Sequence, residues 1–216
     1  WNLNYTAAAN LKTINSASNG LIALGENATY SSTNDGASWT QTAFHFMQSY
    51  TAYKTSTALY TSTNNFGVYR TTNNGANWIN PTNGLDFWSI RSFTQSGSIL
   101  FAGMNNVGVY NSTDDGLSWN ALGLSGNTVF AMNTTGLTLL AGTKDNGIFY
   151  STTNGLSWAQ TNVNSGTIYS IYSNGVRLFA GGTAAGINIS TTGGTSWSTV
   201  SFPSVPLGSF AHINNF

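Results

Sequence analysis

The sequence of 216 residues predicts an all-β protein built from a repeated antiparallel unit, and three observations support this prediction. Six of the seven tryptophans recur at intervals of 38, 39, 41, 39 and 39 residues. Five of these tryptophans end octets of one pattern. The segments between the octets are rich in Thr, Ser, Asn and Gly, and none sustains the apolar spacing of a helix. The periodic tryptophans are Trp1, Trp39, Trp78, Trp119, Trp158 and Trp197.

Each octet predicts a tight hairpin turn. Its Ser or Thr hydroxyl and its third side chain can bond to backbone N–H groups of the turn. Its glycine can take a positive φ at little cost, and its tryptophan ring can fill the wedge between neighbouring sheets. The octets are STNDGASW (32–39), TTNNGANW (71–78), STDDGLSW (112–119), STTNGLSW (151–158) and STTGGTSW (190–197). Their structural glycines are Gly36, Gly75, Gly116, Gly155 and Gly194.

The fourth repeat gives the strands of one unit in order. Residues 128–136 alternate in polarity and end in a glycine turn, and residues 137–147 form an apolar run that a polar turn closes. Residues 148–155 lead into the octet, and residues 156–162 follow its hairpin. Four short strands in a repeat of about 40 residues are typical of a β-propeller, whose units are called blades.

We expect a single propeller domain over residues 1–216. Residues 1–5 match a fourth strand and residues 207–216 match a first strand, so both are left over from the complete blades. Three interpretations stay open: a fragment of a longer repeat array, five blades whose spare strands pair with neighbouring molecules, or an incomplete sixth blade. We favour five blades with spare strands. The complete blades are expected at about 9–42, 49–84, 86–122, 128–162 and 167–202.

The octets resemble the Asp-box, or BNR, repeat S-x-D-x-G-x-x-W of sialidases and many secreted propellers, over residues 1–197. GVYRTTNNGANW and GIFYSTTNGLSW are also similar to exported bacterial repeat propellers. The resemblance implies an extracellular or cell-surface protein whose octets are structural turns on the face opposite an active site. Only Asp114 keeps the third-position Asp of the pattern. The other octets have Asn34, Asn73, Thr153 and Thr192 there.

Composition argues against several classes of function. Six basic and six acidic residues leave no net charge, so we expect neither nucleic-acid binding nor binding to an anionic membrane. No apolar run approaches the length of about 20 residues that a membrane helix needs. There is no cysteine for a disulfide or a thiolate metal site. Calcium prefers about six to eight oxygen ligands with several carboxylates, which the degenerate octets lack. We therefore expect no metal and no cofactor.

Catalysis is not expected either. The sialidase resemblance implies an arginine triad, a Tyr/Glu nucleophile pair and an Asp acid. The three arginines, Arg70, Arg91 and Arg177, occupy three different strand positions of their repeats and do not form one ring. Glu26 is the only glutamate, and the other loop carboxylates belong to different blades, whereas a glycosidase needs two carboxyl groups about 5–9.5 Å apart.

Two loops with extra aromatic residues form a candidate site for a ligand or partner. AFHFMQSY (43–50) contributes Phe46 and Tyr50, and LDFWSIR (85–91) contributes Asp86, Trp88 and Arg91. Trp88 is the one tryptophan outside the repeat period. Exposed rings with a few polar neighbours can stack on a sugar or anchor a protein. The competing interpretation, which we favour for these rings, is that they pack as the lid of the core.

The low charge is the most unusual property of the sequence. Charged residues make up 6%, against about 25% in ordinary domains. Near-zero net charge favours association, and interface cores are depleted in charge. We therefore expect a non-catalytic extracellular structural propeller that assembles with copies of itself, as a homo-oligomer or a filament. The alternative is a lectin-like module that binds glycans or cell-surface proteins. A sialidase-like hydrolase is a more distant alternative.

Overall fold

A computed structural model describes residues 11–17, 20–25, 28–42, 49–63, 67–81, 84–85, 89–183 and 186–201. These residues form strands and turns, and no helix occurs among them. A membrane-crossing helix is accordingly not found in the described ranges. The chain divides into two compact units, one up to Ser89 and one from Ile90.

The first unit contains two antiparallel sheets. The first sheet has the order β1 (Leu11–Ala17), β2 (Gly20–Gly25), β3 (Thr29–Ser32), β4 (Thr40–Gln41). The second sheet has three strands, β5 (Ser49–Lys54), β6 (Leu59–Thr63) and β7 (Val68–Thr71). Ile79 makes a single antiparallel bridge to Arg70, where the other sheets have a fourth strand. Pro81 follows closely, and a proline donates no ladder hydrogen bond, so the pairing does not extend.

The second unit contains three four-stranded antiparallel sheets. The third sheet has the order β11 (Asn120–Gly123), β10 (Gly108–Ser112), β9 (Ile99–Met104), β8 (Ile90–Ser96). The fourth sheet contains β12 (Val129–Thr135), β13 (Thr138–Thr143), β14 (Ile148–Ser151) and β15 (Ala159–Gln160). The fifth sheet contains β16 (Ile168–Ser173), β17 (Leu178–Gly182), β18 (Ile187–Ser190) and β19 (Ser198–Val200). The predicted all-β fold of short antiparallel strands is confirmed.

Strand direction assigns each turn to one of two ends of its sheet. The strands run in chain order and alternate in direction, so the hairpin between first and second strands and the octet hairpin share one end. We call this the octet end. The loop between second and third strands and the start of the first strand share the opposite end. We call that the loop end.

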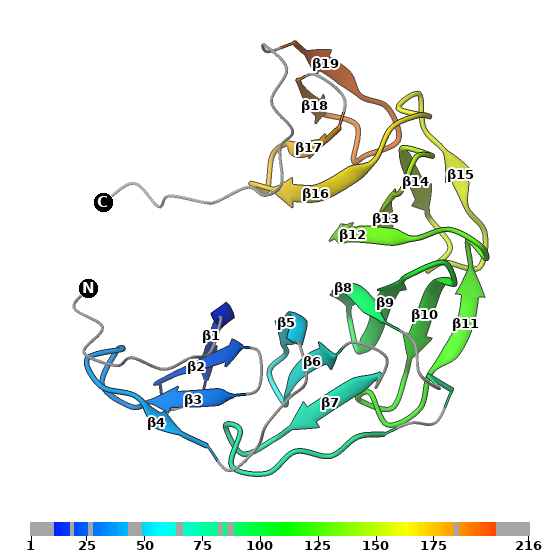
Figure 1. The fold of residues 1–216 in the computed structure, drawn as a ribbon. Helices are drawn as coiled ribbons and strands as arrows, with labels where there is room; N and C mark the ends of the chain where they lie inside the picture. Colours follow the sequence, from blue (N-terminus) through cyan, green and yellow to red (C-terminus); the bar gives the residue numbers. More distant parts are fainter. Residues whose placement is uncertain are drawn as a thin grey trace. The chain divides into compact units, whose positions relative to one another are not determined.

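Neighbouring sheets of the second unit bury apolar faces between them. β12 contacts both β8 and β16, so the first strands of the three sheets lie side by side (Figure 1). Successive residues of a strand face opposite sides of its sheet. Leu139 accordingly joins a cluster with Phe101 of the third sheet, whereas Leu140 joins a cluster with Ile168 of the fifth. Each sheet therefore presents one apolar set to the sheet before it and another to the sheet after it.

Two glycines, which have no side chain, allow these sheets to approach each other closely. A Cβ added to Gly103 would lie 2.7 Å from Cγ1 of Val129, and a Cβ added to Gly142 would lie 2.7 Å from Cγ2 of Ile168. Val129 and Ile168 are the first residues of β12 and β16, and both are fully buried. The first strand of one sheet thus packs directly on the second strand of the sheet before it.

Candidate functional site

Most residues of the predicted aromatic site lie outside the part of the chain that the structure describes. This holds for Phe46, Asp86 and Trp88, and also for the side chain of Tyr50, whose backbone is part of β5. Arg91 is described and is the second residue of β8. The two-loop site therefore stays a prediction, and Arg91 is the member whose surroundings can be described.

Arg91 occupies a β-bulge that recurs in the second unit. The pairing of first and second strands shifts register between Ile90 and Ser92, between Val129 and Ala131, and between Ile168 and Ser170. β1 and β5 also have a register shift near their starts. A bulge leaves one residue outside the ladder and re-aims its side chain. The residues at the three shifts in the second unit are Arg91, Phe130 and Tyr169.

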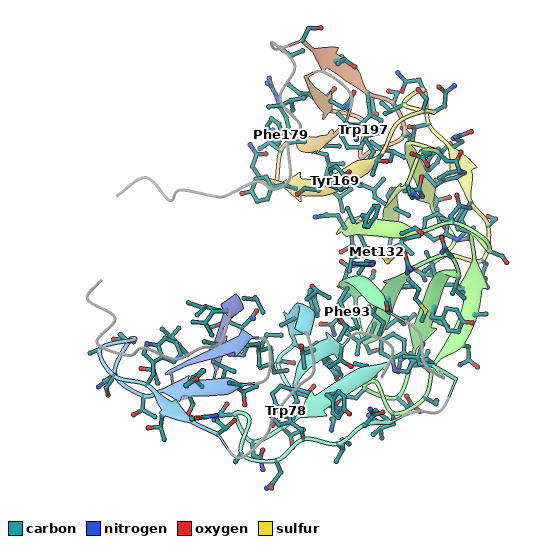
Figure 2. All side chains as sticks on the ribbon, in the orientation of Figure 1. Trp78, Phe93, Met132, Tyr169, Phe179 and Trp197 are labelled. Carbon is teal, nitrogen blue, oxygen red and sulfur yellow. The ribbon has the colours of Figure 1, made fainter. Side chains whose placement is uncertain are left out.

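Arg91, Phe130 and Tyr169 form a continuous line of side chains, which we call the bulge row. Cζ of Arg91 lies 5.9 Å from the centroid of the Phe130 ring. The Phe130 and Tyr169 ring centroids are 5.5 Å apart with their planes at 52°. These are favourable cation–π and tilted aromatic contacts. Arg91 and Phe130 are half-buried, whereas Tyr169, which Figure 2 labels beside β16, is 39% exposed. The row is thus held by contacts among its own side chains, and Tyr169 is its exposed member.

Hydrogen bonds fix the loops beside the bulge row. The Asn106 N–H donates to Oγ1 of Thr128 over 3.0 Å, and that hydroxyl donates to Oδ1 of Asn106 over 2.7 Å. Asp145 and Thr167 repeat the arrangement at the next junction, with distances of 3.3 and 3.1 Å. We call these two pairs the loop latches. Each latch joins the loop end of one sheet to the residue that precedes the first strand of the next.

The five octets make the same turn with different third residues. In each, the hydroxyl of the first residue accepts from the glycine N–H over 2.8 to 3.0 Å. The third side chain accepts from the N–H of the seventh residue, again over 2.8 to 3.0 Å. All five octet glycines have positive φ. Because Asp, Asn and Thr each supply an acceptor oxygen, the turn does not depend on the carboxylate. The third residues are Asn34, Asn73, Asp114, Thr153 and Thr192.

The octet tryptophans pack as parts of the sheet interfaces. Trp197 lies in a cluster with Leu140 of the preceding sheet, and Trp158 packs against a cluster that contains Phe101 of the sheet before it. The Trp197 indole N–H also donates to the Gly194 carbonyl over 2.9 Å. Figure 2 labels this ring between the fourth and fifth sheets. Trp78, Trp119 and Trp197 are buried, and Trp39 and Trp158 are half-buried.

Asp114 is an acceptor in the octet turn, and its hydrogen bonds lower its pKa to about 2 from an ordinary value of 3.8. The main causes are bonds from Ser118, whose hydroxyl and backbone N–H donate to the carboxylate over 2.6 and 2.9 Å. The folded state therefore favours the ionised form. Its contribution to stability is present above pH 3.8 and is lost as the pH falls through about 2.

We expect Asp114→Asn to change the free energy of unfolding by less than about 0.5 kcal/mol at neutral pH, because Asn34 makes the same contact in the first octet. Asp114→Ala removes the acceptor and should cost about 1 kcal/mol. Urea unfolding at neutral pH and near pH 2 measures both effects. The wild type should lose more stability on acidification than Asp114→Asn, and an equal loss would contradict the role assigned to the carboxylate.

No group of three His, Asp or Glu side chains comes together within the described ranges. In the first unit, a hollow of about 100 Å³ is lined by Lys54, by Ser, Thr and Asn residues, and by the apolar residues Ile22, Ala58 and Leu59. Ligand pockets usually measure about 300–1,000 Å³, so this hollow is small for a metabolite. The bulge row is not a pocket either: Tyr169 is exposed, and Arg91 and Phe130 are half-buried.

Comparisons with known proteins identify the fold alone. No protein-family model matches the sequence, and no curated protein matches it. Among solved structures, a GH74 enzyme from Niastella koreensis is similar with a TM-score of 0.69 and 17% identity, over 88% of this chain and 38% of that one. YCF48 bound to D1 peptide is similar with a TM-score of 0.66 and 16% identity, over 88% of this chain and 67% of that one.

A third similar structure is the extracellular domain of a putative hybrid two-component system from B. thetaiotaomicron. Its TM-score is 0.63 at 13% identity, over 89% of this chain and 34% of that one. The chain thus spans less than half the length of this structure and of the GH74 enzyme. Together with the five antiparallel sheets, these likenesses identify the fold as a β-propeller whose sheets are its blades.

Proposed function

We propose that this chain is a non-catalytic, extracellular structural propeller that assembles with copies of itself. In this proposal the octets are Asp-box turns, which hold the hairpins and do no chemistry. The observation that carries the proposal is the character of the outer strands β4, β11, β15 and β19. Every residue of these strands except Leu122 is exposed, and none is charged.

Uncharged outer strands leave the edges of the blades open to pairing. An edge strand presents unpaired N–H and C=O groups, and soluble proteins usually protect such edges with charged residues or proline. The outer strands here are two to four residues long, so one pairing is weak. Several edges on one molecule act together, however, and multivalent contacts strengthen one another. A head-to-tail pairing that does not close would produce a filament.

The extracellular and non-catalytic parts of the proposal have separate support. One solved structure of similar fold is an extracellular domain, and another holds a bound peptide. In the second unit, Asp114 accepts hydrogen bonds from the turn of its own octet, and Asp145 accepts one from Thr167 at the loop end. A glycoside hydrolase would need two convergent carboxyl groups, so assays on fluorogenic glycosides and sialosides should show no turnover.

Lysine on an outer strand should weaken self-association. Ala121 and Ala159 are exposed alanines on β11 and β15, so Ala121→Lys and Ala159→Lys each add a charge at an edge with little loss of packing. Ser98→Lys adds the same charge in the exposed turn between β8 and β9 and serves as the control. Static light scattering over a concentration series measures the average mass.

The wild type and Ser98→Lys should show a mass that increases with concentration, and the two outer-strand variants should show a smaller increase. If Ser98→Lys reduces association as much as they do, net charge and not the edge is responsible. If the outer-strand variants associate like the wild type, the edges are not the contact.

A second candidate function is a lectin-like carbohydrate-binding module, and the bulge row favours it. The row places two aromatic rings and a guanidinium in one line, of which Tyr169 is exposed and the other two are half-buried. Sugars are bound through stacking on aromatic faces together with a few directed polar groups. This function and self-assembly use different surfaces, so one does not exclude the other.

A further inference from the structure

Four apolar side chains are exposed at the octet end of the second unit, and we call them the tip patch. Leu117 and Leu156 are the sixth residues of their octets, and they are 44% and 82% exposed. Leu137 lies in the turn between β12 and β13, Val176 lies in the turn between β16 and β17, and they are 79% and 81% exposed. These are four of the six exposed large hydrophobic residues in the described part of this unit. Exposed apolar side chains grouped on one face usually mark a binding surface.

Two backbone N–H groups of the tip patch are hydrogen-bonded within their own turns. The Leu156 N–H donates to the Thr153 carbonyl over 3.2 Å, and the Val176 N–H donates to Oδ1 of Asn174 over 3.0 Å. An unsatisfied donor is costly to bury, whereas these two donors are already paired. Removal of these turns from water therefore gains the burial of apolar area and leaves both donors satisfied.

The charges at the octet end of the second unit lie on opposite sides of the tip patch. Asp114 and Asp115 belong to the third blade and Arg177 to the fifth, and the other described charges of this unit are at the loop end. Leu137 and Leu156 belong to the blade between them, because β12 contacts both β8 and β16. The order across the three blades is thus negative, apolar and positive. Such a surface is complementary to a second copy of itself that is turned by a two-fold axis.

We propose that the octet ends of two chains bind face to face, about a two-fold axis that passes through the fourth blade. Leu137 and Leu156 lie at the centre of this contact, and Arg177 of each copy faces Asp114 and Asp115 of the other. This inference rests on the proposed self-assembly and adds a second contact surface to the outer strands. Unlike edge pairing, the contact is complete when two chains have joined.

The size of the octet end indicates a weak dimer. Facing sheets lie about 10 Å apart and neighbouring strands about 4.8 Å apart, so three blades of four strands span about 20 by 15 Å between their outermost centres. A stable interface buries about 800 Å² of each partner. The tip patch and its flanking charges offer less than this area, so we expect a dissociation constant in the micromolar range.

Sedimentation equilibrium separates the tip patch from the outer strands. Every variant is built in the Ala121→Lys chain, in which edge pairing through β11 is weakened. The mass of this chain should level off near two chains as the concentration rises. Leu156→Lys should raise the dissociation constant by about tenfold or more, because a charge enters the centre of the contact. Ser98→Lys places the same charge at an exposed polar position of the same end and should leave the dissociation constant nearly unchanged.

An exchange of charges tests the two-fold arrangement. Arg177→Glu and Asp115→Lys each bring like charges together across the contact, so each variant alone should dimerise about tenfold more weakly. Asp115 is chosen because Asp114 accepts hydrogen bonds in its own turn. An equimolar mixture of the two variants should restore dimers, since the new glutamate of one chain faces the new lysine of the other, and Arg177 faces Asp115 at the second pair. Thermal melting of each variant checks that its fold is intact.

The outcomes distinguish this contact from edge pairing. A monomeric Ala121→Lys chain at every concentration would overturn the inference, and growth of the wild type would then still support the outer strands. A wild type whose mass levels off at two chains would retain the inference and contradict edge pairing. Equal effects of Leu156→Lys and Ser98→Lys, or no recovery in the mixture of folded variants, would also overturn it. If Asp115→Lys does not fold, the comparison of Leu156→Lys with Ser98→Lys decides alone.

Phosphatidylcholine vesicles test a competing occupant of the tip patch. We expect the wild type not to float with the vesicles, because its charges match a second copy and not a lipid surface. Flotation that Leu156→Lys abolishes, together with a monomeric Ala121→Lys chain, would assign the tip patch to a lipid surface and overturn the inference.

Discussion

Gly155→Ala is expected to lower the free energy of unfolding by about 3 kcal/mol, through two separate costs. Gly155 has a φ of 85°, where an alanine is strained by about 1–2 kcal/mol. An added Cβ would lie 2.3 Å from Cδ2 and 2.8 Å from Cγ of Leu122. Leu122 belongs to the preceding blade, and overpacking of this kind costs about 1–3 kcal/mol. The octet glycine is therefore needed for the turn and for the interface between blades.

A matched variant separates the two costs. Gly136 has a φ of 56°, and an added Cβ would meet no atom within 4 Å. Gly136→Ala should therefore lose only about 1 kcal/mol, the conformational cost alone. Adding Leu122→Ala to Gly155→Ala relieves the clash, so the two substitutions together should cost less than the sum of their separate effects. Urea unfolding measures the wild type, the three single variants and the double variant, and equal losses in the two glycine variants would contradict a contact between blades.

Trp197→Ala is expected to cost about 4 kcal/mol, the largest effect of any single octet change. The ring is 6% exposed and lies in a cluster with Leu140 and Ile148 of the preceding blade and Ile168 of its own. Asn162 meanwhile bonds to the backbone N–H and C=O of Trp197 over 2.9 and 2.7 Å. An alanine at this position keeps both backbone bonds. The loss of stability therefore measures the packing of the ring and its indole hydrogen bond to Gly194.

Trp197→Phe should lose less than Trp197→Ala, because a phenyl ring fills part of the wedge. Leu156→Ala is the surface control from the neighbouring octet, where the side chain is 82% exposed, and should change stability by less than about 0.5 kcal/mol. Thermal and urea unfolding measure these changes. A loss for Trp197→Ala as small as that for Leu156→Ala would mean that the ring does not hold the blades together.

The fold is predictable because each repeat contains residues with strong preferences for a particular backbone conformation. The tryptophan period located the hairpins, and the glycine before each tryptophan fixed the turn. The spacing of the tryptophans predicts four strands in every blade, whereas the second sheet has three. This spacing carries no information about the position of a proline that ends strand pairing. Pro81 follows Ile79 at the point where a fourth strand would continue, and Ile79 makes only a single bridge.

The bulge row was less predictable. The loop LDFWSIR (85–91) indicates Arg91 as a candidate, but neither of the two aromatic loops includes Phe130 or Tyr169. Strict alternation assigns Phe130 to one face of its strand, and a register shift of one residue changes that assignment. The usable signal was the alignment of repeats, since the second position of each inner strand of the second unit holds a cation or an aromatic ring.

The small number of charged residues is the sequence feature that supports the proposed self-assembly. The charged residues are few, and the outer strands have none, so the edges that most soluble proteins protect are left open. The bulge row lies on the inner strands of the same blades. An assembled propeller could therefore keep its inner surface for ligands while its outer strands pair.

Sedimentation velocity of the wild-type chain, from nanomolar to high micromolar concentration, tests self-assembly most directly. Self-assembly through the outer strands predicts a sedimentation coefficient that increases with concentration, and elongated particles in negative-stain images of the same samples. Ala159→Lys should reduce the increase. A single species with the mass of one chain across the whole range would contradict the proposal.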